Sequence, residues 1–290
     1  MNPLSSRMNT QLFLLADGFV QPKLIEFFRN HSFDIQAIDP GISDQGLVAA
    51  VELNNPSFVL SVNLDRYPPD GLFENRDFKW LNIHFGKLPE YAGTHPVQRA
   101  MINGETDIRV NLCSINSFSG SLGIIDEAGT PVFFDDTGYT VSVRCAELGE
   151  QIIEENLRKM FNPDIEFTRS EATWRKIWER DFDMLNIVNW HRTAFEIHNQ
   201  IRAFSRPFSG VGSMINGSDV TIWESELADP FSFDVAPGTV LGKYKRSGLE
   251  VATGSGTLRI LEFECANKWD IVKGDCFADI EEQPKIYEGV

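Results

Sequence analysis

The chain has 290 residues and a net charge of −16, from 26 Lys and Arg against 42 Asp and Glu. This length can hold one domain of roughly 150–200 residues and a smaller second one, sizes that bury a full core without disulfides. Such acidity repels polyanions, so nucleic acid is not an expected partner. The four cysteines are far apart in the sequence and form no Cys-x-x-Cys pair. They therefore predict neither a metal site nor a disulfide framework, and they fit a reducing, cytoplasmic setting.

The first apolar run, residues 12–16, is far shorter than a signal-peptide core or a membrane span. We therefore expect a soluble protein that has no membrane partner.

Short apolar runs alternate with helical patterns over the first hundred residues. Residues 11–15, 33–38 and 58–62 are typical of strands, and residues 20–30 and 46–53 lie between them. This βαβαβ order predicts an α/β domain with a Rossmann-like parallel sheet wrapped by helices. Ligands of such sheets bind beyond the carboxyl ends of the strands.

Further elements are expected between residues 80 and 161. Residues 80–84 and 109–115 read as strands, and a helix between them begins at Pro96 and ends at Ile102, since proline suits a first helical turn. Residues 126–130, flanked by 124–125 and 132–134, predict the turn of a hairpin. A long helix is then predicted from Thr140 to Phe161, with a break at Asn162-Pro163.

A second domain is expected after a tryptophan-rich connection at residues 174–190. A short helix from Thr193 to Phe204 precedes closely spaced strands, which predict a small β-barrel of the OB-like kind. The predicted domains are therefore 1–185 and 186–290. The expected strands of the barrel are 212–215, 220–224, 239–244, 249–253 and 257–264.

Asn82 and His84 are the strongest candidates for chemistry. They are two residues apart at the end of a predicted strand, so their side chains leave the same face at the edge where α/β sheets place their sites. An Asn amide donates an N–H to a carbonyl oxygen, and His moves a proton near neutral pH. On spacing alone, such a pair at a strand end more often only caps a loop.

Residues 81–105 decide between these alternatives. The Asn-x-His, the Leu-Pro four residues beyond His84, the Tyr-x-Gly, the Pro-x-Gln and the Asn-Gly-Glu together resemble the signature of the formyltransferase family. That family includes methionyl-tRNA formyltransferases and nucleotide-sugar N-formyltransferases. Segments 201–210, 220–224, 237–241 and 251–261 are similar to the carboxy-terminal barrel of the methionyl-tRNA enzymes. The resemblance covers about residues 10 to 280.

This resemblance implies transfer of a formyl group from 10-formyltetrahydrofolate to an amine, without a metal. In the family an Asn amide and an imidazole stabilise the tetrahedral oxyanion, which assigns those roles to Asn82 and His84 here. The folate is expected along the loop 63–73, with Tyr67 and Leu72, and over Leu88 and Pro89.

One position departs from the family. Its third catalytic residue is an Asp in an Asp-Thr-Gly segment, and the alignment puts Gly120 at that position. Without the carboxylate, the site lacks a base and the partner that fixes the imidazole tautomer. The residues that remain as substitutes are Asn116, Ser119, Ser121 and Asp126. The alternatives to a transferase are a catalytically silent folate-binding or interaction protein and a 10-formyltetrahydrofolate hydrolase.

The acceptor is expected to be a small amine. Residues 191–290 contain 10 Lys and Arg against 15 Asp and Glu, which disfavours contact with a phosphate backbone. The one local basic cluster of this region, residues 243–246, reads as a solvated hairpin turn. We therefore expect a nucleotide-linked amino sugar first and an amino acid or peptide-like intermediate second. A homo-oligomer is a further expectation that the sequence leaves open.

Overall fold

The computed structural model describes most of the chain, and its contacts divide it into two units. The first unit comprises residues 1–96, 107–131 and 142–180, and the second comprises 97–106, 132–141 and 181–290. The boundary between residues 185 and 186 stays a prediction. The described residues are 11–16, 21–31, 33–63, 69, 72, 79–115, 121–160, 168–173, 185–231, 234–245, 248–266 and 270–278.

The first unit is built on a seven-stranded sheet in the order β2-β1-β3-β4-β5-β6-β7. Strands β1 to β4 pair in parallel, and β5 to β7 join the sheet antiparallel. The predicted α/β domain is therefore confirmed, with a mixed rather than fully parallel sheet. Its strands are β1 (Gln11–Ala16), β2 (Asp34–Ile38), β3 (Phe58–Val62), β4 (Lys79–Phe85), β5 (Asp107–Ile115), β6 (Ser121–Pro131) and β7 (Thr168–Thr173).

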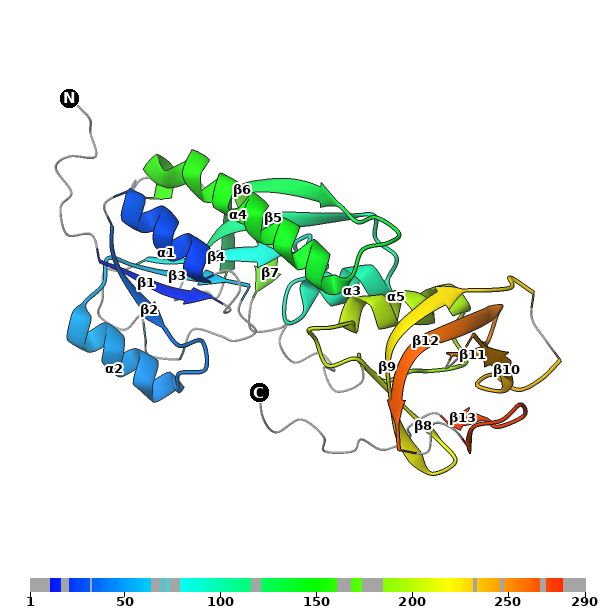
Figure 1. Cartoon of the computed structure of the whole chain (residues 1–290). Coiled ribbons are helices and arrows are strands. Elements are labelled where there is room, and N and C mark those ends of the chain that lie inside the picture. The colour runs from blue at the N-terminus through cyan, green and yellow to red at the C-terminus, as the bar shows by residue number, and fades with distance from the viewer. Residues whose placement is uncertain are drawn as a thin grey trace. The chain divides into compact units, whose positions relative to one another are not determined.

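Helices cover both faces of this sheet. In Figure 1, α1 (Gln21–Asn30) and α4 (Gly138–Met160) lie on one face and α2 (Asp44–Asn54) lies on the other. Leu47 and Val51 of α2 pack in one cluster with Trp80 and Cys113. On the opposite face, α4 approaches so closely at Gly149 that an added Cβ would lie 3.0 Å from Ile83. Because both faces are covered, β1 and β3 are apolar almost throughout, as expected for central parallel strands.

The predicted hairpin around residues 126–130 is wrong. Those residues belong to β6, which runs unbroken from Ser121 to Pro131 and pairs with β5 from Ile115 to Asp107. A register shift near Cys113 absorbs one extra residue of β6. The long neighbouring strand supplies hydrogen-bond partners to the whole segment, and this pairing outweighs the local turn propensity of Asp126 to Thr130.

Two helix predictions are confirmed closely. Helix α3 (Pro96–Ile102) has its predicted bounds, and α4 begins two residues before the predicted Thr140. The predicted break at Asn162-Pro163 lies outside the described residues, as does most of the tryptophan-rich connection.

The second unit contains an antiparallel sheet in the order β10-β11-β12-β9-β8-β13, against which α5 (Ala194–Phe204) packs. Thr193 caps α5 in a reciprocal capping box with Glu196. The Asn216-Gly217 turn joins β8 to β9 with positive φ at both residues, as such two-residue hairpins need. The strands are β8 (Val211–Ile215), β9 (Ser218–Leu227), β10 (Val240–Tyr244), β11 (Gly248–Ala252), β12 (Thr257–Cys265) and β13 (Phe277–Ala278).

The two edges of this sheet meet at one end. The Val240 amide donates to the Asp275 carbonyl at 2.8 Å, and the Phe277 amide donates to the Gly238 carbonyl at 2.9 Å. Trp190 stacks on Phe277 with ring centroids 4.9 Å apart. The sheet is therefore a partly closed barrel, which agrees with the prediction.

Candidate active site

Two polar side chains, one in β3 and one in β4, orient the Asn82 amide. Ser61 lies directly beside Asn82 in the parallel pair, and its hydroxyl donates to Asn82 Oδ1 at 2.8 Å. The same hydroxyl oxygen accepts from Trp80 Nε1 at 2.9 Å. All three side chains are buried. The Ser61 hydroxyl also lies 3.3 Å from the Leu81 carbonyl, but Asn82 Oδ1 is the nearer acceptor. With Oδ1 on Ser61, the amide NH₂ group of Asn82 faces away from it, and that group is the hydrogen-bond donor the site offers.

The tautomer of His84 is fixed in a similar way. Its Nε2 lies 3.0 Å from the Tyr91 carbonyl, and a carbonyl can only accept, so Nε2 carries the proton and the ring's lone pair is on Nδ1. The ring is 4% exposed, and burial lowers the pKa of His84 to about 4. At neutral pH the imidazole is therefore uncharged.

The loop after β4 folds back over the strand end. At Gly86 an added Cβ would lie 2.8 Å from Pro96 Cβ and 3.0 Å from Tyr91 Cβ, so only glycine fits there. This close return places the Tyr91 carbonyl on the His84 ring. This close approach explains why residue 86, in the His-Phe-Gly segment, is glycine.

Asn111 and Glu127 lie in line with His84 on β5 and β6, the next two strands of the sheet. His84 pairs with Asn111 in β5, and Asn111 pairs with Glu127 in β6. Directly paired residues point to the same face, so these three side chains share the face that carries Asn82. Asn111 donates through Nδ2 to the Gly86 carbonyl at 2.7 Å.

Asp126, one of the substitutes for the missing acid, points the other way. It pairs with Leu112, which pairs with Ile83, and its Oδ2 accepts from Asn156 of α4 at 2.6 Å. It therefore lies on the face covered by α4, opposite Asn82 and His84. Gly120, Asn116 and Ser119 lie outside the described residues, and nothing is described of the Ser121 side chain.

The residues expected to contact folate fall into two groups. Leu88 packs against the core cluster at the start of the loop, and the Leu88-Pro89 peptide bond is cis. Leu72 is fully buried in the same cluster with Phe13 and Trp80, where it serves packing. Tyr67 lies outside the described residues. Contact of any of them with folate stays a prediction.

Sequence reasoning missed Ser61, Trp80, Asn111 and Glu127 as parts of this site. Ser61 is the one polar residue in the apolar strand β3, which was a signal that it has a buried partner. The other three depend on the register between strands, which no single strand's sequence reveals.

Comparison with known proteins identifies the family. Residues 184–277 match the model described as "Formyl transferase, C-terminal domain". The methionyl-tRNA formyltransferase of Nitrosococcus oceani is 30% identical over 229 residues, covering 78% of this chain and 65% of that protein. The corresponding enzyme of Synechococcus sp. is 29% identical over 246 residues, covering 80% and 74%. The chain belongs to the formyltransferase family.

Solved structures show the same fold at lower identity. HypX from Aquifex aeolicus in complex with tetrahydrofolic acid matches this chain with a TM-score of 0.68 at 19% identity, over 88% of this chain and 44% of that one. The N-formyltransferase from Helicobacter canadensis, in complex with folinic acid and dTDP-3-aminofucose, matches with a TM-score of 0.61 at 20% identity, over 89% and 100%. Among the described helices of this chain, none is long and apolar enough to cross a membrane.

Proposed function

We propose that this formyltransferase moves the formyl group of 10-formyltetrahydrofolate to the primary amine of a small molecule, with a nucleotide-linked amino sugar as the first candidate. The observation that carries the proposal is the hydrogen-bond chain from Trp80 through Ser61 to Asn82, beside a neutral His84. A donor locked in one orientation costs no reorganisation when charge develops in the transition state.

The proposed reaction begins when the amine lone pair attacks the formyl carbon. A C–N bond forms, and the carbonyl electron pair moves to the oxygen, where Asn82 Nδ2 donates a hydrogen bond to it. The electron pair then returns to the carbonyl carbon and the bond to the folate nitrogen breaks. The attacking nitrogen loses one proton and the folate nitrogen gains one, so the products are a formamide and tetrahydrofolate. Loss of one such donor costs about 10²–10³ in rate.

Its hydrogen bond to the Tyr91 carbonyl gives His84 a different role from the one that the family resemblance implies. Its Nε2 proton is engaged by the Tyr91 carbonyl, so its Nδ1 can accept a hydrogen bond from the incoming amine but cannot donate to an oxyanion. With its pKa lowered to about 4, the ring is uncharged at neutral pH, so it offers the amine a lone pair on Nδ1 and no second N–H donor.

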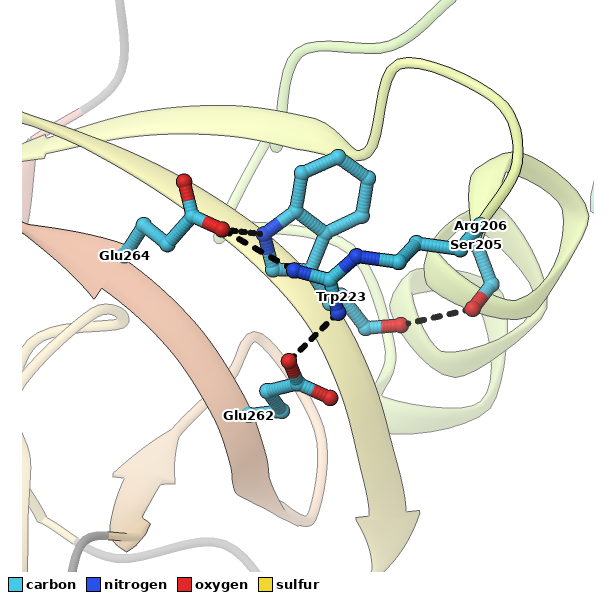
Figure 2. A network of polar contacts seen from close by, with 5 residues as sticks. All are labelled: Ser205, Arg206, Trp223, Glu262 and Glu264. Carbon is cyan, nitrogen blue, oxygen red and sulfur yellow. Dashed lines mark hydrogen bonds and ion pairs between the residues drawn. The ribbon is translucent and has the colours of Figure 1, made fainter.

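The electrostatics of the second unit support a small acceptor. Figure 2 shows the Arg206 guanidinium held between Glu262 and Glu264, and its Cζ lies 4.3 Å from the centroid of the Trp223 ring. Trp223 Nε1 also donates to Glu264 at 3.1 Å. The two carboxylates therefore neutralise the positive charge of Arg206, and the guanidinium is not available to bind a phosphate.

Two other arginines of this unit are engaged in the same way. Arg259 pairs with Glu226 at 3.2 Å, and Arg202 donates to the carbonyls of Phe133 and Asp136 at 2.9 and 3.0 Å. A hollow of about 490 Å³ on the barrel is lined in part by Asp219, which adds negative charge. Phosphate-backbone binding needs several free cations, so these contacts favour a small amine over tRNA.

Methionyl-tRNA is the second candidate acceptor, because the relatives that align over most of this chain are methionyl-tRNA formyltransferases. Both candidates belong in one assay. The purified chain is mixed with 10-formyltetrahydrofolate and dTDP-3-aminofucose, simple amino sugars, amino acids or methionyl-tRNA, and release of tetrahydrofolate is followed by absorbance.

Variants and control reactions distinguish a transferase from a hydrolase and from a folate-binding protein. We expect release with one small amine, a loss of at least about a hundredfold in Asn82→Ala, and no change in His191→Ala, whose side chain is exposed. Equal rates with and without an amine would instead show a hydrolase. Absence of turnover with every acceptor would leave a folate-binding protein.

A further inference from the structure

We infer that Asn111 and Glu127 form the subsite that holds the acceptor's amino group, with Glu127 as the carboxylate that takes its proton. This inference rests on the proposed transfer and specifies its acceptor side. The position of the family's Asp is taken by Gly120 in this chain. The acceptor amine, which is an ammonium ion at neutral pH, still needs a base before it can attack.

Strand register brings Glu127 to the site. Each strand lies about 4.8 Å from the next, so His84, Asn111 and Glu127 form a row about 10 Å long on one face of the sheet. Burial raises the pKa of the Cys113 thiol, which lies two residues from Asn111 on this face, and the negative charge of Glu127 raises it further. Glu127 is exposed, and among the described residues no donor is bonded to its carboxylate.

Asn111 supplies the second observation. Its side chain is fully buried, yet its Oδ1 has no hydrogen-bond partner. The amide cannot simply be turned over, because Nδ2 donates to the Gly86 carbonyl at 2.7 Å and lies 3.4 Å from the His84 carbonyl. A buried acceptor left without a donor costs free energy, which a ligand carrying N–H groups would recover.

The chemistry of the row matches an ammonium group. His84 Nδ1, Asn111 Oδ1 and a Glu127 carboxylate oxygen are three acceptors, and R–NH₃⁺ has three N–H donors. One N–H bond breaks, its electron pair stays on nitrogen, and the proton moves to the Glu127 carboxylate. The freed lone pair then attacks the formyl carbon as proposed above.

Other charged groups share this face of the sheet with Glu127. Arg109 and Asp107 lie on the same face of β5, and they pair with each other at 3.3 Å between Nε and Oδ1. His84 is the remaining titratable group of the row, and it is neutral near pH 7. The test therefore compares ligands at one pH rather than reading a pH profile.

The test measures equilibrium binding by titration calorimetry on the intact chain. Its two probes are a dTDP-linked 3-amino sugar and the same compound with a hydroxyl in place of the amine, so the nucleotide contributes equally to both. We expect the wild type to prefer the amine about 10- to 100-fold. Glu127→Gln should remove that preference, and Glu127→Asp should retain part of it.

Asp126→Asn is the matched control, because it removes a neighbouring carboxylate on the opposite face and should leave the preference intact. The subsite is wrong if Glu127→Gln still prefers the amine, or if the wild type shows no preference. Turnover that survives in Glu127→Gln would contradict the proposed subsite and agree with the proposed formyl transfer. A Glu127-dependent preference for the amine without turnover would contradict the proposed formyl transfer instead.

Discussion

Ser61 sets the orientation of Asn82, although it never contacts a substrate in the proposed reaction. In Ser61→Ala the hydroxyl that accepts from Trp80 and donates to Asn82 is lost, so the amide can turn its oxygen toward the reacting carbonyl. We expect kcat to fall on the order of tenfold or more and the free energy of unfolding to fall by about 1–3 kcal/mol.

A suitable control for this change is Ser114→Ala. Ser114 of β5 pairs with Leu81 of β4 and therefore lies on the opposite face from Asn82. Steady-state rates and urea unfolding of both variants check the prediction. Equal rates for the two variants would show that Asn82 does not depend on Ser61.

The His84 ring makes stability depend on pH. Its pKa is about 4 in the folded chain and 6.5 ordinarily, so below pH 6.5 the unfolded chain binds the proton and the folded chain does not. Stability should therefore fall from pH 6.5 to pH 4 by at most about 1.4 kcal/mol per pH unit from this ring. Above pH 6.5 the ring has no effect.

Urea unfolding of the wild type and His84→Gln at several pH values isolates this contribution. His198, whose pKa is also lowered to about 4 by burial and by Arg202, titrates in the same window in both proteins and cancels in the difference. Parallel pH curves for the two proteins would contradict a buried, neutral His84.

At the scale of an element, the start of α4 depends on a close approach that only glycine allows. An added Cβ on Gly138 would lie 2.1 Å from the Ala203 carbonyl oxygen at the end of α5. Backbone cannot yield as a flexible side chain does, so Gly138→Ala should cost about 1–3 kcal/mol. Gly242→Ala in β10 is the control, because nothing lies within 4 Å of its added Cβ. Equal midpoints in urea would refute this account of α4.

The elements also show what the sequence alone can predict. Helix α3 and the capped helix α5 carry their start signals locally, in Pro96 and in the Thr193 and Glu196 pair, so both were predicted. Strand β6 was split into a hairpin because its acidic residues, Gly129 and Thr130 read as a turn. Its pairing with β5 is a long-range contact that no local pattern contains.

The same limit applies to the site. Asn82 and His84 could be named as candidates from the sequence because they are two residues apart in one strand and stand in a family signature. Asn111 and Glu127 reach the site only through pairing across three strands, and Asp126 is excluded only by that same register. Registers are set by tertiary packing, so sequence could suggest Asp126 but could not place it.

At the scale of the whole molecule, the net charge of −16 opposes tRNA. We expect weak binding of methionyl-tRNA whose affinity changes little between about 50 and 200 mM salt, because few phosphate contacts mean few released counterions. Filter binding across that range measures it. A steep loss of affinity with salt would instead reveal a cationic surface and favour tRNA as the acceptor.

The central claim is that formyl transfer takes place at Asn82 and His84. It is tested most directly by giving the protein 10-formyltetrahydrofolate labelled with ¹³C in the formyl group, together with the acceptor panel, and following the label by NMR. We predict that the label appears in the formamide of one small amine, and that Asn82→Ala slows this at least about a hundredfold. Label found in formate, or label that stays on the folate, would contradict the account.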